Sequence, residues 1–276
     1  MAAVAEQWRE NRPTAGARVL RLGELWSYRE LVYFLALRDV KSRYKQAFFG
    51  IGWTVFQPIV GVAIFTVVFR RLAEVPSEGV PYSVFALLGF VIWSYFAGSF
   101  GNASGSLVAN ASLVTKIYFP RLAAPIASLL PGLVHLTIGL ALLSGLMALV
   151  GFVPSLAAPL LAVCVLWTMA VALGPGLLFA TMNVKYRDVG AVAGFLTQLW
   201  FLASPVAYPS SLVPDAWRWA YAANPMVGVL DTARWAVLGT PRPGPEILVS
   251  LGVTLALLGL GLLYFQRTER EFADVI

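Results

Sequence analysis

Long apolar stretches alternate with short polar or basic segments along this chain. The stretches free of Asp, Glu, Lys and Arg cover residues 46–69, 79–115, 122–184, 189–214 and 247–266. A helix that crosses a bilayer needs about 20 apolar residues, so we predict one crossing in each stretch and two in the third. Gly151-Phe-Val-Pro154 supplies the turn residues that divide the third stretch. The pattern predicts an all-α membrane domain over residues 46–267 with six transmembrane helices.

A further helix is predicted before the first crossing, over residues 24–45. Its apolar positions recur three and four residues apart: Leu25, Tyr28, Leu31, Val32 and Leu35. It also carries the cations Arg38, Lys41, Arg43 and Lys45. Apolar, aromatic and cationic residues together are typical of a helix that lies in the headgroup plane of a membrane. Such a helix is either a generic surface anchor or a cationic collar that binds an anionic lipid headgroup.

The segment of residues 204–240 between the fifth and sixth predicted crossings is long and rich in aromatic residues and proline. We predict two short helices there, over residues 216–223 and 226–238, separated by Asn224-Pro225 and closed by Gly239. They are too short to cross a bilayer, so we interpret them as a re-entrant pair. Two interpretations remain for the aromatic residues, an interfacial belt or a stacking surface for sugars at a glycan path or exit: Trp217, Trp219, Tyr221 and Trp235.

Composition and charge agree with a membrane protein. Hydrophobic residues make up 59% of the chain and charged residues 12%, against roughly 45–50% and 25% in soluble domains. Fifteen of the twenty Lys and Arg residues fall on one side of the predicted membrane, together with both termini. Positive segments stay in the cytoplasm, so we predict cytoplasmic tails at residues 1–23 and 268–276. We expect these cations to meet lipid headgroups rather than nucleic acid, and we expect no cleaved signal peptide.

The predicted crossings contain no chemistry for ion coupling or catalysis. His135 is their one ionisable candidate and is interpreted as a packing residue, while Cys164 is the one cysteine. Phosphate-binding loops, zinc-binding helices and nucleophile elbows are absent from the sequence. Asp188 and Asp231 fall between predicted crossings near arginines, and we interpret them as surface ion pairs. We therefore expect no active site, no metal and no bound cofactor, so that any ATP must be bound by a partner.

Glycine is frequent in the second predicted crossing, at Gly98, Gly101 and Gly105. Small residues let helices approach closely, and close packing is the simpler interpretation. The same residues would also leave room along a conduit. The sequence leaves both possibilities open.

Two short basic segments lie between predicted crossings. The first reads NASLVTKIYFPR over Asn110 to Arg121, and the second reads NVKYRDV over Asn183 to Val189. Both are too short to be domains, and their polar and aromatic pattern differs from that of plain turns. We predict that another protein binds them at the membrane face, which indicates a transporter driven from outside its own chain.

Taken in order, these segments carry a family resemblance. The motifs are LWSYRELVYFLALRDVKSRYKQ at Leu25 to Gln46, SLVTKIYFPR at Ser112 to Arg121, NVKYRDV, SPVAYP from Ser204, and NPM at Asn224 to Met226. The chain resembles the permease subunit of ABC exporters that move lipid-linked O-antigen, capsule, teichoic acid or related polysaccharides. The resemblance implies a homodimer in the bacterial inner membrane with two separate ATPase subunits, which bind ATP and Mg.

The resemblance also assigns roles to residues. It implies a coupling helix at residues 112–119, with a second contact in the later basic segment; the residues concerned are Ser112, Leu113, Lys116, Tyr118, Phe119, Arg121, Tyr186, Arg187 and Asp188. The helix of residues 24–45 resembles the family's interface helix at the lateral opening, where Arg38, Lys41, Arg43 and Lys45 would meet the lipid headgroup. His135 stands where members often carry an acidic residue in the third crossing.

The function expected from the resemblance is export of a lipid-linked polysaccharide, driven by a partner ATPase. A polytopic glycosyl- or acyltransferase that acts on polyprenyl-linked sugars is one alternative, although the clustered acidic or histidine residues that it needs are absent. An ABC permease for a small lipid or a drug is another. Only the resemblance separates that case from polysaccharide export.

Overall fold

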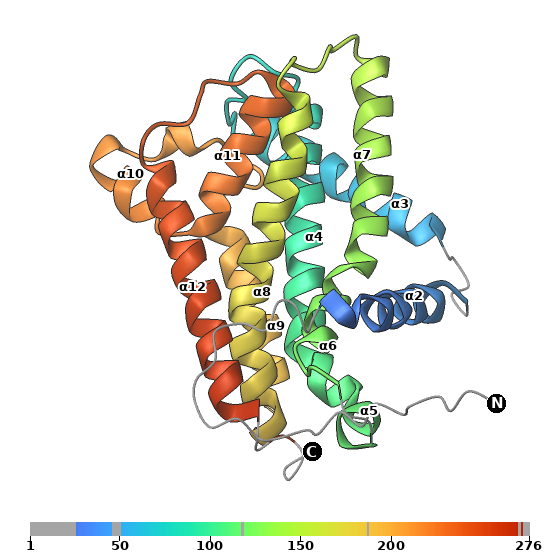
Figure 1. Cartoon of the computed structure of the whole chain (residues 1–276). Helices are drawn as coiled ribbons and strands as arrows, with labels where there is room; N and C mark the ends of the chain where they lie inside the picture. Colours follow the sequence, from blue (N-terminus) through green and yellow to red (C-terminus); the bar gives the residue numbers. More distant parts are fainter. Residues whose placement is uncertain (1–25, 46–50, 117–118, 187, 270–271, 273–276) are drawn as a thin grey trace, which may run out of the picture.

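The computed structural model describes residues 26–45, 51–116, 119–186, 188–269 and 272, and all structural statements below concern these residues. Their regular structure is entirely helical, as Figure 1 shows. The predicted all-α class is confirmed for this part of the chain.

Five stretches in the described part are long and apolar enough to cross a membrane. They are formed by α3 (Ile51–Phe65) with η1 (Thr66–Leu72), α4 (Tyr82–Ala109), α6 (Ala123–Leu129) with α7 (Pro131–Leu149), η2 (Ala158–Leu160) with α8 (Leu161–Lys185), and α12 (Ile247–Thr268). The remaining expected crossing contains α9 (Val189–Leu202), which has 14 residues. At 1.5 Å per residue α9 is about 21 Å long, short of the roughly 30 Å hydrocarbon core. The predicted count of six crossings is therefore not confirmed.

The turn that divides the longest apolar stretch is confirmed. Helix α7 ends at Leu149, and Gly151 adopts a φ of +67°, a left-handed conformation that glycine reaches without a steric penalty. Helical structure resumes at Ala158.

Helix α4 forms the centre of the bundle and packs against α3, α6, α7, α8 and α11 (Figure 1). Its side chains Phe85, Leu88 and Phe96 are fully buried. On the other side of α8 lies α12, and the two helices approach closely, because a Cβ on Gly261 would overlap the carbonyl oxygen of Gly174. Buried small residues thus bring the backbones of α8 and α12 into contact.

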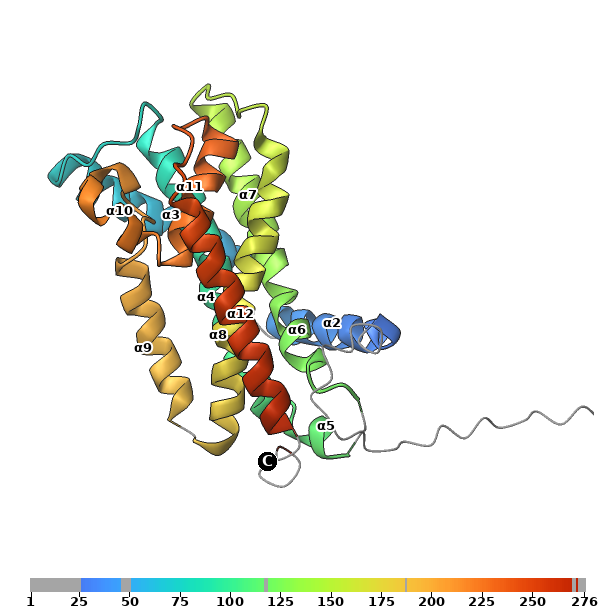
Figure 2. The ribbon, with the colours of Figure 1, turned by 60° about the vertical axis from the view of Figure 1, so that its left-hand side comes forward.

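The predicted helix before the first crossing is confirmed as α2 (Arg29–Lys45), which lies across the bundle in both views (Figures 1 and 2). Leu35 and Ala36 are buried, on the helix that packs against α6 and α7. Tyr33 and Phe34 are 60% and 63% exposed. The helix therefore has two apolar surfaces, one on the protein and one available to lipid, rather than the single apolar face that the sequence predicts.

The two ends of the bundle differ (Figure 1). One end, here called the α5 end, holds α5 (Ala111–Lys116), the turn between α8 and α9, and the end of α12. The opposite end, called the α10 end, holds η3 (Ser210–Leu212), α10 (Asp215–Tyr221) and α11 (Pro225–Leu238). Both predicted short helices are confirmed: the Asn224 side chain accepts a hydrogen bond from the amide of Met226, and Gly239 ends α11 with a φ of +69°.

Candidate functional site

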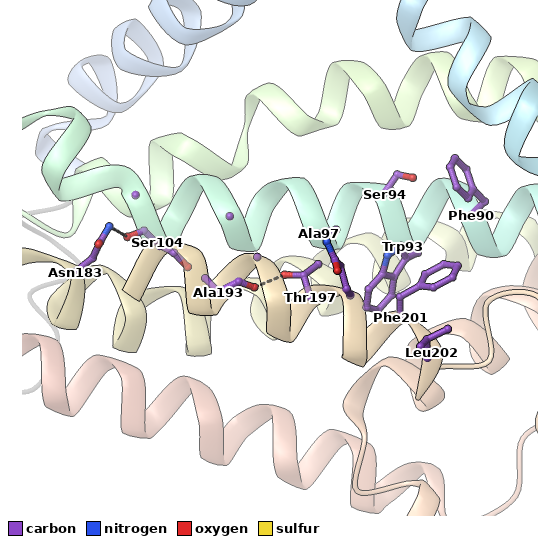
Figure 3. A pocket seen from close by; sticks show the side chains of 15 residues that line it. Phe90, Trp93, Ser94, Ala97, Ser104, Asn183, Ala193, Thr197, Phe201 and Leu202 are labelled. Atoms are coloured by element: carbon purple, nitrogen blue, oxygen red, sulfur yellow. Dashed lines mark hydrogen bonds between the residues drawn. The ribbon is translucent and has the colours of Figure 1, made fainter. Parts of the chain in front are cut away.

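A cavity of about 800 Å³ lies between α4 and α9, with one residue contributed by the end of α8 (Figure 3). We name it the α4–α9 pocket. The residues that line it are Phe90, Trp93, Ser94, Ala97, Gly101, Ser104 and Gly105 from α4, Asn183 from α8, and Gly190, Ala193, Gly194, Thr197, Gln198, Phe201 and Leu202 from α9.

Three glycines of α4 leave this region open. A Cβ added to Gly98, Gly101 or Gly105 would meet no atom within 4 Å, and the same holds for Gly194 on α9. Gly139 on α7 contrasts with them, because its Cβ would come within 2.8 Å of the Val91 side chain. The sequence left close packing and open space as alternatives, and within this chain these glycines of α4 border open space.

Uncharged side chains line the α4–α9 pocket. Ser94, Thr197 and Gln198 bring hydroxyl and amide groups, and among the residues that the structure describes no Lys, Arg, Asp, Glu or His lines the pocket. Trp93 and Phe201 meet edge to face with their ring centroids 5.5 Å apart. Pockets that are mostly apolar and aromatic, with a few polar groups, suit neutral polar ligands. The hydroxyl and amide groups of this surface can form hydrogen bonds with such a ligand.

A second cavity of about 420 Å³ lies between α2, α4 and α6, and we name it the Arg38–Arg43 pocket. Arg38 Nη2 donates to Asn110 Oδ1 at 2.7 Å and to Asp39 Oδ1 at 2.7 Å. Arg43 Nη2 donates to Asn102 Oδ1 at 3.3 Å. Guanidinium groups bind phosphate through paired charge-assisted hydrogen bonds, so the two arginines give this pocket groups that can bind an anion. The carboxylate of Asp39 also lines the pocket and pairs with Arg38, so an anion would have to compete with it for that arginine.

The two pockets share lining residues. Gly101 and Gly105 line both of them. The two pockets therefore meet on the surface of α4, at positions where this helix carries no side chain.

Some of the expected coupling residues are exposed and others are buried. Ser112, Lys116, Tyr186 and Asp188 are exposed, whereas Leu113 is half-buried. Tyr118 and Arg187 lie outside the described residues. All of the exposed ones belong to the α5 end of the bundle.

Phe119 and Arg121 face the protein instead. Phe119 is buried in a cluster that includes Val114, Phe265 and Phe272. Arg121 Nη1 donates to the carbonyl oxygen of Glu269, and its guanidinium lies 5.9 Å from the centroid of the Phe272 ring. These contacts attach the segment after α5 to the end of α12.

The remaining predicted residues do not line either pocket. Trp217 and Trp219 are 67% and 56% exposed on α10. Tyr221 shares a hydrogen bond of 3.0 Å with Tyr208, and Trp235 lies under Arg242. Lys41 and Lys45 are exposed on α2.

The predicted surface ion pair at Asp231 is wrong. Asp231 and Arg234 lie on α11, 4.0 Å apart, with side chains that are 25% and 2% exposed. Burial raises the pKa of Asp231 to about 6, against the lowering effects of Arg234 and of the hydroxyl that Ser210 donates at 2.8 Å. Burial also lowers the pKa of Arg234 to about 10, so this arginine stays charged at neutral pH. The sequence placed the pair outside the crossings and gave no sign that α11 packs inside the bundle.

Sequence reasoning also missed the aromatic and polar lining of the α4–α9 pocket. Thr197 and Gln198 are adjacent polar residues in a charge-free stretch, and they were the available signal. Among the described residues, no group of three or more His, Cys, Asp or Glu side chains could hold a metal ion.

Comparison with known proteins matches most of the chain. The profile of the ABC-2 type transporter family matches residues 30–238. An O-antigen export system permease protein, RfbA from Myxococcus xanthus, is 31% identical over 92% of this chain and 98% of its own length. An RfbA from Klebsiella pneumoniae is 27% identical over 90% of this chain and 95% of its own length. The polysialic acid transport protein KpsM from Escherichia coli is 24% identical over 85% of this chain and 92% of its own length.

Proposed function

Because this chain belongs to the ABC-2 type transporter family, we propose that it is the membrane-spanning permease of an ATP-driven exporter that moves a lipid-linked polysaccharide across the bacterial inner membrane. The named O-antigen export and polysialic acid transport relatives match it over nearly their whole length. ATP and Mg belong to the separate ATPase partner of such a permease, and the chain itself is a transport subunit rather than an enzyme.

The α4–α9 pocket is the observation that best supports a glycan as the substrate. A polymer that slides needs many weak contacts, since one tight site would stop it. The hydroxyl and amide groups of the pocket can exchange hydrogen bonds with sugar hydroxyls, and its aromatic rings can stack on sugar faces. In this proposal the pocket is one wall of the path, and a second copy of the chain supplies the other wall.

The Arg38–Arg43 pocket serves the lipid end of the substrate in this proposal. A polyprenyl diphosphate carries an anionic headgroup, and the two arginines can bind its phosphate oxygens. The exposed Tyr33 and Phe34 support a position of the same helix at the lipid surface. Gly101 and Gly105 then let the first sugars pass from this pocket to the α4–α9 pocket, since α4 presents no side chain there.

The α5 end is the cytoplasmic end in this proposal. The charge distribution supports it, since fifteen of the twenty cations lie on the side predicted to be cytoplasmic. Exposed residues of α5, above all Lys116, form the contact with the ATPase subunits, of which a dimeric permease binds two. ATP binding would move α5 and, through the buried contacts of Phe119 and Arg121, the end of α12.

Purification of the tagged chain with its ATPase partner, followed by reconstitution into lipid vesicles, tests the function. We expect lipid-linked glycan to stimulate ATP hydrolysis and to become accessible on the far side of the vesicle. Hydrolysis that responds to a small lipid or a drug but not to the glycan would contradict the substrate. A chain that purifies without an ATP-binding subunit would contradict the exporter.

A further inference from the structure

A buried arginine lies outside both pockets. Arg234 on α11 is 2% exposed, and its guanidinium lies 3.7 Å from the centroid of the Phe85 ring. Burying a charge costs free energy unless hydrogen bonds and an opposite charge compensate it. The only acid in contact is Asp231 at 4.0 Å among the described residues. Arg234 therefore depends on its other hydrogen bonds for compensation.

Those hydrogen bonds go to the backbone of the segment that follows α9. Arg234 Nη2 donates to the carbonyl oxygen of Val206 at 2.8 Å, and Nη1 donates to that of Tyr208 at 3.4 Å. Because residues 203–208 are not helical, their carbonyl groups need partners from elsewhere.

Two more side chains supply such partners. Tyr82, the first residue of α4, donates its hydroxyl to the carbonyl oxygen of Ala207 at 2.8 Å. Asn224, at the start of α11, donates from Nδ2 to the carbonyl oxygen of Ala203 at 3.0 Å. Side chains from two helices thus hold four carbonyl groups of one six-residue segment, and Arg234 alone holds two of them.

The segment of residues 203–208 lies at the α10 end of the α4–α9 pocket. A Cβ on Gly89 would overlap the carbonyl oxygen of Val206, so the backbone of the segment lies directly against α4. The next residue, Phe90, lines the pocket, as does Leu202 near the end of α9 (Figure 3). The segment therefore attaches α9 to α4 where the pocket ends.

The opposite end of α9 is held by apolar packing instead. Val189 and Ala193, the buried residues of α9, both lie there. Near this end Asn183 Nδ2 donates to the carbonyl oxygen of Ser104 at 3.3 Å, and Gly194 borders open space. The two ends of α9 are therefore held by different kinds of contact, and the proposed ATPase contact lies at the α5 end.

We propose that Arg234 is a positioning residue that fixes the α10 end of the α4–α9 pocket, so that the pocket changes its width at the α5 end during transport. The transport part of this inference rests on the proposed function. During transport α9 then tilts about its α10 end, which the Val206–Tyr208 segment attaches to α4.

Cross-linking tests the proposal in the chain assembled with its ATPase partner in membrane vesicles. One cysteine pair, Phe90→Cys with Leu202→Cys, reports the α10 end, and a second pair, Ser104→Cys with Gly194→Cys, reports the α5 end. Cys164 is replaced by alanine in both. The measured quantity is the yield of the intramolecular product with a short bismaleimide, with and without a non-hydrolysable ATP analogue.

We expect the analogue to change the yield of the α5-end pair and to leave the α10-end pair unchanged. Arg234→Met should make the yield of the α10-end pair depend on the analogue as well, and Arg234→Lys should have a smaller effect. Tyr82→Phe removes one hydrogen bond without removing a charge, and should act in the same direction if Arg234→Met does not fold. Arg218→Met on α10 is the matched control, because its arginine is exposed.

An α10-end yield that responds to the analogue in the unmodified background would overturn the proposal, and so would an unchanged yield in folded Arg234→Met protein. Failure of the proposed function gives a different result. In that case neither pair responds to the analogue, but Arg234→Met still alters the α10-end yield without nucleotide, which supports the positioning role alone.

Discussion

The Nη2 atom of Arg38 lies 2.7 Å from the Oδ1 atom of Asn110. Asn110 ends α4, and its carbonyl oxygen accepts hydrogen bonds from the amides of Leu113 and Val114 at the start of α5. One residue therefore links the Arg38–Arg43 pocket, the central helix and the helix proposed to contact the ATPase. A ligand that binds Arg38 would change the hydrogen bonds of Asn110 directly.

Arg38→Met should weaken the response to substrate. Loss of charge-assisted hydrogen bonds should raise the concentration of lipid-linked glycan that half-stimulates ATP hydrolysis about tenfold. Arg38→Lys keeps the charge but lacks the planar pair of donors, so it should raise this concentration less than Arg38→Met does. Lys41→Met is the matched control, since Lys41 is exposed on the same helix and lines neither pocket. Equal shifts for both positions would indicate general attraction to the membrane rather than a site.

Gly101→Leu should block export while leaving the protein folded. The new side chain enters space that both pockets share, and leucine is favoured over glycine in a helix by about 1 kcal/mol. Export by vesicles and the melting temperature are the two measurements. Gly145→Leu on α7 is the control, because a Cβ there also meets no atom within 4 Å, and Gly145 lines neither pocket. Normal export by Gly101→Leu would remove this region from the path.

Lys116→Glu should reduce co-purification of the ATPase subunit without changing the melting temperature, because Lys116 is exposed on α5. Arg242→Glu at the α10 end should leave co-purification unchanged. Phe119→Ala should act differently: Phe119 is 6% exposed, so its truncation should lower the free energy of unfolding by about 3–5 kcal/mol. Full recovery of the ATPase subunit with Lys116→Glu would contradict the proposed contact.

The carboxyl group of Asp231 should make stability depend on pH. Its pKa of about 6 in the folded protein exceeds the ordinary value of 3.8 because of burial. The folded state therefore favours the protonated form, and the stabilisation is complete below the ordinary pKa and lost as the pH rises through 6. Between about pH 5 and about pH 7.5 the loss should be about 1 kcal/mol.

Thermal unfolding in detergent at these two pH values measures the effect. Asp231→Asn should show a smaller fall in melting temperature than the unmodified chain. Asp215→Asn should behave like the unmodified chain, because the side chain of Asp215 is 87% exposed. An identical pH response of the Asp231→Asn variant would contradict the raised pKa.

Local signals in the sequence predicted much of this fold. The division of the longest apolar stretch was readable because Gly151 and Pro154 are turn residues. Asn224-Pro225 and Gly239 likewise marked the limits of α11, since a cap, a first-turn proline and a left-handed glycine act within a few residues. The count of crossings was harder, because α9 and the segment after it form one charge-free stretch in which the α-helix has only 14 residues.

The site was less predictable, because it depends on which helices are neighbours. A glycine at position 101 is compatible with a tight helix interface and with an open pocket, and only the position of α9 decides between the two environments. Arg234 lies in a short segment between apolar stretches, where exposure is the usual state of an arginine. Its burial follows from the packing of α11 against α4, α8 and α12, and no local sequence pattern predicts that packing.

The contact between Gly174 and Gly261 limits how this protein can vary in evolution. A methyl group on Gly261 would overlap the carbonyl oxygen of Gly174, and one on Gly174 would overlap the backbone of Leu257 and Leu258, so an alanine at either position requires α8 and α12 to separate. Compensation cannot come from shrinking a neighbouring side chain, because the obstructing atoms are backbone. Related sequences that retain this helix pairing should keep glycine at both positions, and those that lose one should differ in the spacing of the two helices.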